Sequence, residues 1–312
     1  MYKFTPILKT LVWGTESWVL SGVPGSESVV AEGPEAGKKI TDIYPGTFPL
    51  LIKFIDAKRD LSIQVHPDNE LAAKRHGCSG KSEMWYVIGA EPGAKLISGL
   101  KERITPDDYV RLVAEDRITE VLAEHAVAPG DVFFLPSGRI HSIGGGCFLA
   151  EIQQTSDITY RIYDYNRPGL DGKPRQLHTQ EAKDAIDYEV YENYRTPYAL
   201  KQDAPIELVK CEHFTTMLYV FSPAAGTAAA PAPLSGSASL TPDPIRVNGC
   251  AGALPIPAEF LIAIGLKGSG VLRTAQDETT LSAGEAVLIP ASDGSVSVEP
   301  GPDGLRMMTT HP

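Results

Sequence analysis

Residues 61–66 alternate strictly between apolar and polar side chains, reading Leu-Ser-Ile-Gln-Val-His. Side chains two positions apart on a strand share a face, so Ser62, Gln64 and His66 are predicted to line one side of a strand. Glu83 opens the next apolar strand and would bring a carboxylate beside that polar face. Imidazole and carboxylate are ligands suited to zinc or iron. Taken alone, the pattern also fits an ordinary strand whose polar face meets water.

The same alternation, together with short apolar runs, predicts a mainly β chain. Further strands are expected at 50–56, 94–99, 131–135, 141–143, 147–153 and 158–165. Short helices are expected after Asp68, after Thr105 and from Thr179, where helix-start residues precede amphipathic stretches. From residue 205 the pattern is again one of short strands, interrupted by a loop or hairpin rich in Ala, Pro, Gly and Ser at 223–257.

Chain length and composition divide this β pattern into two domains. At 312 residues the chain is long enough for about two cores, and its 25 Pro and 29 Gly favour short strands joined by turns. The first predicted domain covers residues 1–204 and carries a helical insertion at about 104–125. The second covers residues 205–312.

The charge balance excludes several classes of partner. The net charge is −11 and no Lys/Arg-rich run occurs, which argues against nucleic acid and against anionic membranes. An anionic substrate therefore requires a local basic pocket. No signal-peptide core or membrane-spanning stretch is evident, and the four cysteines are isolated, so we expect reduced thiols and a cytoplasmic protein.

A second histidine is placed by a specific spacing. Residues 130–141 read Gly-Asp-Val-Phe-Phe-Leu-Pro-Ser-Gly-Arg-Ile-His, which predicts a strand, a tight turn and a histidine on the returning strand. This run resembles the second motif of cupins, which are small double-stranded β-helix (jelly-roll) barrels. The resemblance implies that His141 joins Gln64, His66 and Glu83 around one metal inside a barrel, with an open position for solvent or substrate.

The run recurs near the C-terminus without its histidine. Residues 284–295 repeat the glycine and proline spacing, and Ser295 stands at the position that corresponds to His141. The predicted fold class is therefore mainly β, with two cupin barrels. The first barrel is predicted to hold the metal, and the second to be structural and free of metal.

Several longer motifs occur together in the first two-thirds of the chain. They are Trp13-Gly14-x-Glu16-x-Trp18, Leu61-Ser-Ile-Gln-Val-His-Pro-Asp68, Gly80-Lys81-x-Glu83-x-Trp85-Tyr86, Thr159-Tyr-Arg161-Ile-Tyr-Asp-Tyr-Asn166-Arg167 and Gly172-Lys-Pro-Arg175-x-Leu177-His178. In combination they resemble the type I mannose-6-phosphate isomerases (phosphomannose isomerases) in their short bacterial form. The resemblance is strong over residues 10–190, and beyond residue 200 it rests on the β pattern alone.

The resemblance implies an activity and a set of site residues. The activity is the interconversion of mannose 6-phosphate and fructose 6-phosphate, an intramolecular oxidoreduction of the aldose–ketose type, with one Zn²⁺ per chain. The family's metal ligands map onto Gln64, His66, Glu83 and His141. Its active-site arginine, neighbouring lysine, first-strand serine and acidic residue map onto Arg161, Lys81, Ser62 and Asp157. Longer family members carry a histidine where this chain has Gly80.

Aldose–ketose isomerisation moves a proton between C2 and C1 through a cis-enediol. The reaction requires a base, stabilisation of charge on O1 and O2, and an anchor for the phosphate. Arg161 and Lys81 are the predicted cations against phosphate or enediolate, and Ser62 is a predicted donor to the phosphate. Lys81 and Asp157 are both candidates for the base.

Two other functions fit the same ligand set. An iron cupin oxygenase also uses two histidines and one carboxylate. A non-enzymatic cupin would instead bind a sugar phosphate as a regulatory signal. For the isomerase we expect a small sugar phosphate as the ligand, and a monomer or homodimer as the assembly.

Overall fold

The computed structural model describes residues 1–44, 46–199, 205–223, 253–257 and 259–312. Most of the segment predicted as a loop or hairpin at 223–257 lies outside these residues. The chain divides into two compact units, each described below by itself. The larger unit comprises Thr5–Val29 and Lys38–Thr196, and the smaller unit comprises Met1–Phe4, Val30–Gly37 and Pro197–Pro312.

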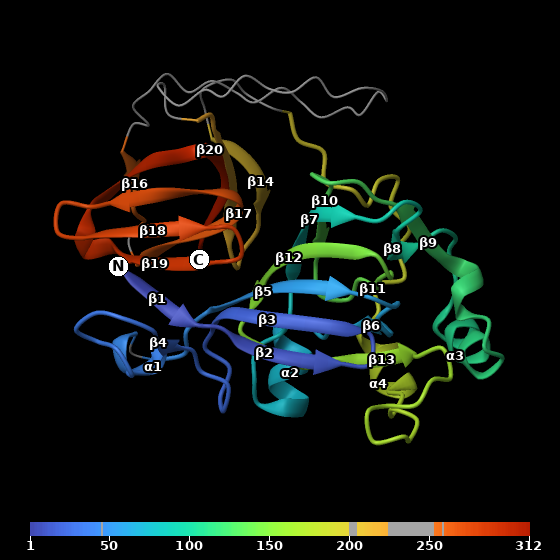
Figure 1. Ribbon diagram of the computed structural model, residues 1–312. Helices are drawn as coiled ribbons and strands as arrows, with labels where there is room; N and C mark the ends of the chain where they lie inside the picture. The colour runs from blue at the N-terminus through green and yellow to red at the C-terminus, as the bar shows by residue number, and fades with distance from the viewer. Residues whose placement is uncertain (45, 200–204, 224–252, 258) are drawn as a thin grey trace, which may run out of the picture. The chain divides into compact units, whose positions relative to one another are not determined.

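The larger unit is built on two antiparallel sheets (Figure 1). The first has the strand order β10-β7-β12-β5-β3-β2, with bounds Val132–Leu135, Glu83–Ala90, Cys147–Gln154, Leu50–Ala57, Gly14–Ser21 and Ile7–Leu11. The second has the order β13-β6-β11-β8-β9, with bounds Tyr160–Tyr163, Ile63–Val65, His141–Ile143, Lys95–Leu100 and Leu122–Ala126. The predicted strands are present, and the fold is mainly β.

One apolar core joins the inner faces of these two sheets. Ile55 and Leu149 from the first sheet pack with Leu96 and Ile143 from the second, and all four are buried. Burying one such aliphatic side chain contributes about 1.5–3 kcal/mol. This core fixes the two sheets face to face and defines the space into which their inward side chains point.

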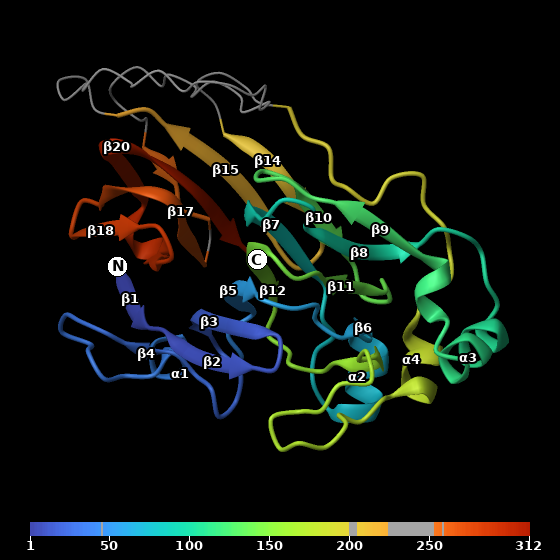
Figure 2. The same ribbon diagram turned by 45° about the vertical axis from the view of Figure 1, so that its right-hand side comes forward.

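The outer face of the second sheet is covered by helices. Ile63 and Val65 pack in a buried cluster with Tyr109 of α3 (Pro106–Ala114) and Ala182 of α4 (Thr179–Ala185). Figure 2 shows α3 and α4 lying side by side next to this sheet. The apolar face of β6 therefore points to the helices, so its polar face points inward between the sheets rather than to water.

The helix-start signals are confirmed. Asp68 caps α2 (Asn69–His76) by accepting a hydrogen bond from Leu71 N, and Thr105 caps α3 by accepting one from Asp108 N. The helical insertion predicted to reach about residue 125 ends earlier. A 3-10 turn covers Ile118–Val121, and from Leu122 the chain becomes β9, because its backbone pairs with β8 at the edge of the sheet.

The smaller unit contains a nine-stranded sheet. Its main path is β14-β15-β20-β17-β19-β1-β4, with bounds Ile206–Lys210, Thr215–Phe221, Ser295–His311, Phe260–Arg273, Ala286–Pro290, Tyr2–Thr5 and Val29–Val30. Off this path, β16 (Leu254–Pro255) pairs with β20, and β18 (Glu278–Ser282) pairs with β17. Its first strand comes from the start of the chain, since Tyr2 pairs with Leu288. The segments Met1–Phe4 and Val30–Gly37 therefore group with the C-terminal residues.

Two remaining elements lie outside the sheets: α1 (Ile40–Ile43) and a 3-10 turn at Ala291–Asp293. Cys78, Cys147 and Cys211 are free thiols. Among the described residues, none of the helices is long and apolar enough to cross a membrane.

Candidate metal centre and active site

Four neighbouring strands place polar residues in one row. Gln64 on β6 pairs with His141 on β11 and with Arg161 on β13, and His141 also pairs with Ser98 on β8. Directly opposed residues in adjacent strands share a face of the sheet. The predicted candidates Gln64, His141 and Arg161 are thus brought abreast by strand register, although 97 positions separate Gln64 from Arg161.

A buried group of three potential metal ligands lies beside this row. His66, Glu83 and His141 are at most 2% exposed, and their ligand atoms all lie within 4.8 Å of one another. His141 Nε2 is 3.3 Å from Glu83 Oε1, and His66 Nε2 is 3.6 Å from Glu83 Oε2. Glu83 enters from β7 of the first sheet, so the cluster joins the two sheets.

The hydrogen bonds of both histidines to backbone carbonyls show which ring nitrogen carries the proton. His66 Nδ1 lies 2.8 Å from the carbonyl oxygen of Ile158, and His141 Nδ1 lies 2.8 Å from that of Arg139. A carbonyl only accepts, so each Nδ1 carries the proton and donates it. Each Nε2 therefore presents a lone pair to the cluster, which is the arrangement of a metal-binding imidazole.

Electrostatics keep these histidines neutral. Burial, followed by the charge of Lys81, lowers the pKa of His141 to about 3. The same two causes hold the pKa of His66 well below its usual range. A neutral imidazole is the protonation state that a metal ion requires.

The donor set fits a bound cation. Glu83 Oε1 is buried and receives no hydrogen bond from the described residues, yet it faces the Nε2 lone pair of His141. Two acceptors at this distance with no hydrogen between them repel one another, and a cation between them removes that repulsion. Two imidazoles and one carboxylate form a ligand set for zinc or iron.

Gln64 lies at the edge of this cluster. Its amide Nε2 is 3.3 Å from His141 Nε2, and its Oε1 is 3.4 Å from the hydroxyl of the buried Ser62. A metal would be bound by the oxygen, which takes the place of the nitrogen when the amide turns by 180° about its last side-chain bond. The amide is therefore within reach of the ligand role predicted for it.

Lys81 extends the cluster with positive charge. Its ammonium contacts the Glu83 carboxylate, lies 3.2 Å from His66 Nε2 and lies 3.7 Å from Glu151 Oε1. The side chain is 4% exposed, and this burial lowers the pKa of Lys81 to about 8. A lysine with that pKa exchanges protons near neutral pH.

Two buried charges in this site have no counterpart in the sequence prediction. Lys53 and Glu151 pair across β5 and β12, and the Lys53 ammonium is 3.1 Å from Glu151 Oε1. Glu151 Oε2 also accepts a hydrogen bond of 2.8 Å from Trp85 Nε1. The signal was available in the sequence: one lysine inside the apolar run 50–57 and one glutamate inside 147–152. Charged residues are almost never fully buried without a partner.

Arg161 is half-buried and has spare donor capacity. Its Nη1 donates to the Gln176 carbonyl at 2.9 Å, while its Nε is buried without an acceptor among the described residues. Burial, followed by the charge of Arg175, lowers its pKa. Asp157, the acidic candidate, is exposed in the segment between β12 and β13.

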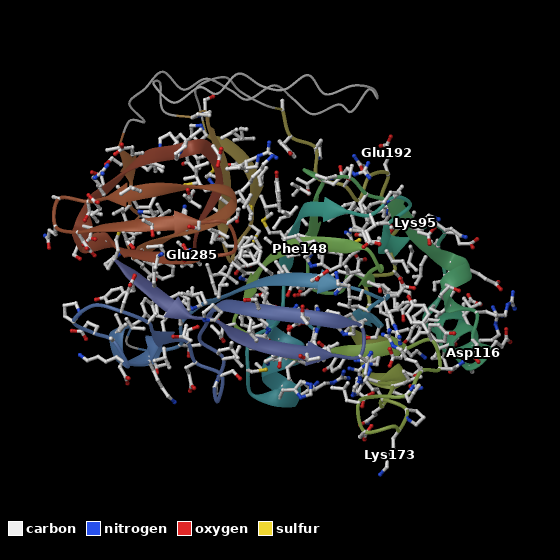
Figure 3. All side chains as sticks on the ribbon, in the orientation of Figure 1. Lys95, Asp116, Phe148, Lys173, Glu192 and Glu285 are labelled. Carbon is white, nitrogen blue, oxygen red and sulfur yellow. The ribbon has the colours of Figure 1, made fainter. Side chains whose placement is uncertain are left out.

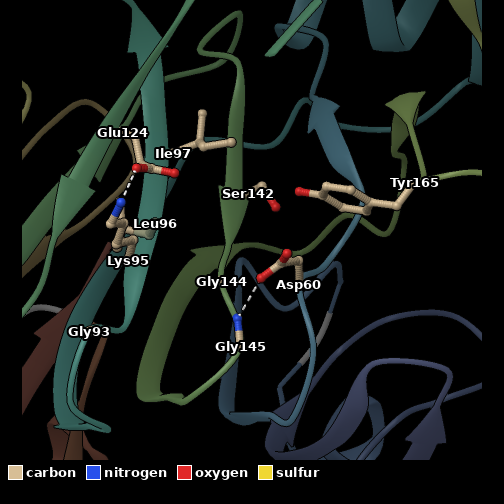
Figure 4. Close-up of a pocket in the computed structure, with 10 residues that line it drawn as sticks. All are labelled: Asp60, Gly93, Lys95, Leu96, Ile97, Glu124, Ser142, Gly144, Gly145 and Tyr165. Carbon is tan, nitrogen blue, oxygen red and sulfur yellow. Dashed lines mark hydrogen bonds and ion pairs between the residues drawn. The ribbon is translucent and has the colours of Figure 1, made fainter. Parts of the chain in front are cut away.

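A separate cavity of about 330 Å³ opens on the other face of β11. Its wall includes Ser142, and successive residues of a strand point to opposite faces, so this wall faces away from His141. In Figure 4 the Tyr165 hydroxyl points toward Ser142, with Asp60 and Gly145 below it. The metal cluster is thus not part of this cavity.

Gly80 has no room for a side chain. A Cβ at this position would lie 2.5 Å from the carbonyl carbon of Asp68, 2.6 Å from Asn69 N and 2.8 Å from the oxygen of Pro67. All three are backbone atoms, which do not move aside as the end of a side chain does. A histidine preceding Lys81 is therefore incompatible with this backbone.

Comparison with known proteins identifies the family. Residues 15–86 match the family described as phosphomannose isomerase type I, catalytic domain. A mannose-6-phosphate isomerase of Streptococcus mutans is 38% identical over 182 residues, which cover 55% of this chain and 57% of that enzyme. A probable mannose-6-phosphate isomerase of Bacillus subtilis is 32% identical over 312 residues, which cover 95% of this chain and 89% of that protein.

Solved structures agree with these sequence matches. The mannose 6-phosphate isomerase from Bacillus subtilis matches with a TM-score of 0.81 and 26% identity, covering 100% of this chain and 99% of that one. The apo form of the Salmonella typhimurium enzyme has the same fold, with a TM-score of 0.71 at 15% identity over 100% of this chain and 98% of that one. The fold, the site and these matches define an enzyme of the aldose–ketose isomerase class. The chain belongs to the mannose-6-phosphate isomerase family.

Proposed function

We propose that this protein interconverts mannose 6-phosphate and fructose 6-phosphate through a cis-enediol, with one zinc ion per chain. The observation that carries the proposal is the buried His66–Glu83–His141 cluster with both Nε2 atoms directed inward, in a chain of this family. The buried ammonium of Lys81 and the guanidinium of Arg161, abreast of the cluster, supply the local positive charge that an anionic substrate requires.

The zinc would be held by His66, Glu83 and His141, with the Gln64 amide oxygen as the fourth protein ligand. When bound, zinc polarises hydroxyl and carbonyl oxygens as a Lewis acid. Because Glu83 is the only carboxylate among these ligands and Gln64 is neutral, the occupied site keeps a net positive charge. That charge favours an enediolate over the neutral sugar.

Arg161 is assigned to the anionic groups of the substrate, the phosphate and the enediolate. Lys81 is assigned to the enediolate, beside which its amine becomes an ammonium when it accepts the proton. The unsatisfied Nε of Arg161 is one donor that such an anion would meet. Ser62 would donate its hydroxyl to the phosphate. We add Lys53 and Glu151 to the site as the buried pair that positions the ammonium of Lys81.

We assign the proton transfer between C2 and C1 to Lys81 Nζ. Its pKa of about 8 leaves a fraction of the side chain neutral near pH 7, and a base with a pKa close to the working pH is the most effective. Asp157 is the competing candidate. Its side chain is exposed, whereas that of Lys81 is buried within the cluster.

The proposal also covers the fold of each unit, the cellular location and the oligomeric state. We infer that each unit is a cupin-type barrel. We further infer that the larger unit is the catalytic domain expected at residues 1–204, and that the smaller unit, which also takes in Met1–Phe4 and Val30–Gly37, is the metal-free domain expected at residues 205–312. We also infer a cytoplasmic enzyme that works as a monomer or homodimer.

One experiment tests the function. The purified protein is assayed with mannose 6-phosphate in a coupled assay for fructose 6-phosphate, before and after treatment with a chelator and after zinc is restored. We expect turnover that disappears on chelation and returns with zinc. Bound iron, oxygen uptake and no ketose would indicate an oxygenase instead. Sugar-phosphate binding without turnover would indicate a regulatory protein.

A further inference from the structure

A buried carboxylate lies three positions after Arg161 in the chain. Asp164 is 5% exposed and follows β13 directly. Its Oδ1 accepts hydrogen bonds from Arg167 Nε at 3.0 Å and from Arg167 Nη2 at 2.8 Å. Arg175 holds the same carboxylate through both oxygens, with Nε 2.6 Å from Oδ2 and Nη2 2.5 Å from Oδ1. Two arginines thus converge on one buried acid.

The segment between these residues is a loop that returns to β13. His178 N donates to the Arg161 carbonyl at 2.7 Å, and Arg161 N donates to His178 Nδ1 at 3.0 Å. An isolated antiparallel β-bridge between Pro168 and Pro174 joins the two sides of the loop. The loop therefore starts and ends on the strand that carries Arg161.

The turn at the start of the loop is strained. Tyr165 and Asn166 both have left-handed backbone conformations, with φ of 56° and 51°. Such conformations cost energy in residues other than glycine, and they persist where surrounding contacts enforce them. Here they turn the chain so that Arg167 reaches back to Asp164. The hydrogen bonds from Arg167 to Asp164 close this turn.

The Asp164–Arg175 ion pair is linked to the guanidinium of Arg161 through a single intervening residue, Gln176. Arg175 is followed directly by Gln176, and the carbonyl of Gln176 accepts the hydrogen bond from Arg161 Nη1. The bidentate contact between Asp164 and Arg175 anchors the residue directly before Gln176. Because Asp164 also neutralises one positive charge in a group of three arginines, it limits the repulsion that Arg161 meets from Arg167 and Arg175.

We propose that Asp164 is a positioning residue that, through Arg175 and the Gln176 carbonyl, orients the guanidinium of Arg161 toward the substrate anion. The inference rests on the proposed role of Arg161 in the isomerase. Both oxygens of the Asp164 carboxylate already have partners in Arg167 and Arg175, so its effect on the substrate is indirect.

The test is a double-mutant cycle of Asp164→Asn with Arg161→Ala. An asparagine keeps the shape but replaces one acceptor oxygen with a donor that faces a guanidinium, so the bidentate pair is lost. We expect Asp164→Asn alone to lower kcat/KM by about 10- to 100-fold, because small displacements of a positioned group have effects of that size. In the Arg161→Ala background we expect it to have less than about a 2-fold effect.

Three controls complete the experiment. Lys173→Ala alters the tip of the same loop, where the side chain points away from the fold (Figure 3), and should leave kcat/KM unchanged. Metal content should stay at the wild-type level in every variant. If Asp164→Asn does not fold, Arg175→Lys takes its place in the cycle, since a lysine keeps the charge and loses the fork.

The outcomes are distinct. If Asp164→Asn lowers kcat/KM by the same factor in both backgrounds, or leaves it unchanged in the wild type, Asp164 does not act through Arg161 and the inference fails. If Arg161→Ala itself keeps full activity, the proposed role of Arg161 fails and the inference fails with it. A loss in the wild type that vanishes in the Arg161→Ala background supports it.

Discussion

The ammonium of Lys53 lies 3.1 Å from the carboxylate of Glu151, and both side chains are almost completely buried in the first sheet of the larger unit. Their positions follow from strand register, because Lys53 and Glu151 are direct partners across β5 and β12. Glu151 in turn pairs with Trp85 across β12 and β7. A row of polar contacts thus runs across the sheet that supplies Glu83.

Breaking this pair should destabilise the protein. Removing Lys53 leaves the buried Glu151 with only the more distant ammonium of Lys81, at 3.7 Å, so Lys53→Met should lower the free energy of unfolding by about 3 kcal/mol, the lower end of the range for a broken buried pair. The double variant Lys53→Met with Glu151→Gln should be more stable than Lys53→Met alone, because the glutamine is neutral and still accepts from Trp85 Nε1. Urea unfolding followed by tryptophan fluorescence measures both. A double variant no more stable than the single one would contradict this account.

The same pair predicts an acid-labile contribution to stability. Burial alone would raise the pKa of Glu151, but the charges of Lys53 and Lys81 outweigh it and lower the pKa to about 2. A carboxyl with a lower pKa in the folded state is fully stabilising above its unfolded pKa of about 4.3 and loses that contribution as pH falls toward about 2. Stability should decline over this range in the wild type and more shallowly in Glu151→Gln, as measured by urea unfolding at a series of pH values.

Metal and activity should be lost together when a ligand of the cluster is removed. We expect Glu83→Gln and His141→Ala to bind less than about a tenth of the wild-type metal, because each variant keeps only two of the three histidine and glutamate ligands that a catalytic zinc site of this kind uses. His125→Ala is the matched control, since His125 hydrogen-bonds the Ser98 carbonyl and lies outside the cluster. Elemental analysis and the coupled assay give the two readouts. Full metal content in Glu83→Gln would rule out the ligand assignment.

Two substitutions separate the candidate bases. If Lys81 transfers the proton, Lys81→Met should lower kcat by at least about 100-fold, whereas Asp157→Asn should change it by less than about 3-fold. The measurement is kcat at saturating mannose 6-phosphate with the metal content checked. The reverse pattern would assign the base to Asp157.

Gly80 should not tolerate a side chain. Gly80→Ala places a Cβ against the backbone of Asp68 and Asn69 at the start of α2, and we expect a loss of about 1–3 kcal/mol of stability from this overpacking. Gly33→Ala is the control for adding a methyl group, because open space surrounds that position, although its left-handed backbone adds a strain of its own. Thermal unfolding compares the two. Unchanged stability in Gly80→Ala would show that the backbone of α2 moves aside.

A comparison of β6 with β5 shows which features of the site can be predicted from the sequence and which cannot. Alternation placed Ser62, Gln64 and His66 on one face, and helix-cap chemistry correctly located the starts of α2 and α3. The pairing of Lys53 with Glu151 depends on the register of two strands nearly 100 positions apart, and no local pattern determines such a register. The sequence predicts residues 122–125 as the end of the helical insertion, and their pairing with β8, which makes them a strand, is a long-range contact that the local pattern does not contain.

The pairing of β1 with β19 has a consequence for the order in which the chain folds. Every segment of the larger unit has been synthesised once residue 196 is made, whereas Tyr2 must wait for its partner Leu288. Contacts between residues so far apart in sequence form slowly, because the entropic cost of closing a long loop comes before the contacts stabilise the fold. During translation, one edge of β1 therefore stays unpaired for most of the time that the ribosome needs to complete the chain. An unpaired strand edge is a site where a nascent chain can form non-native strand pairs.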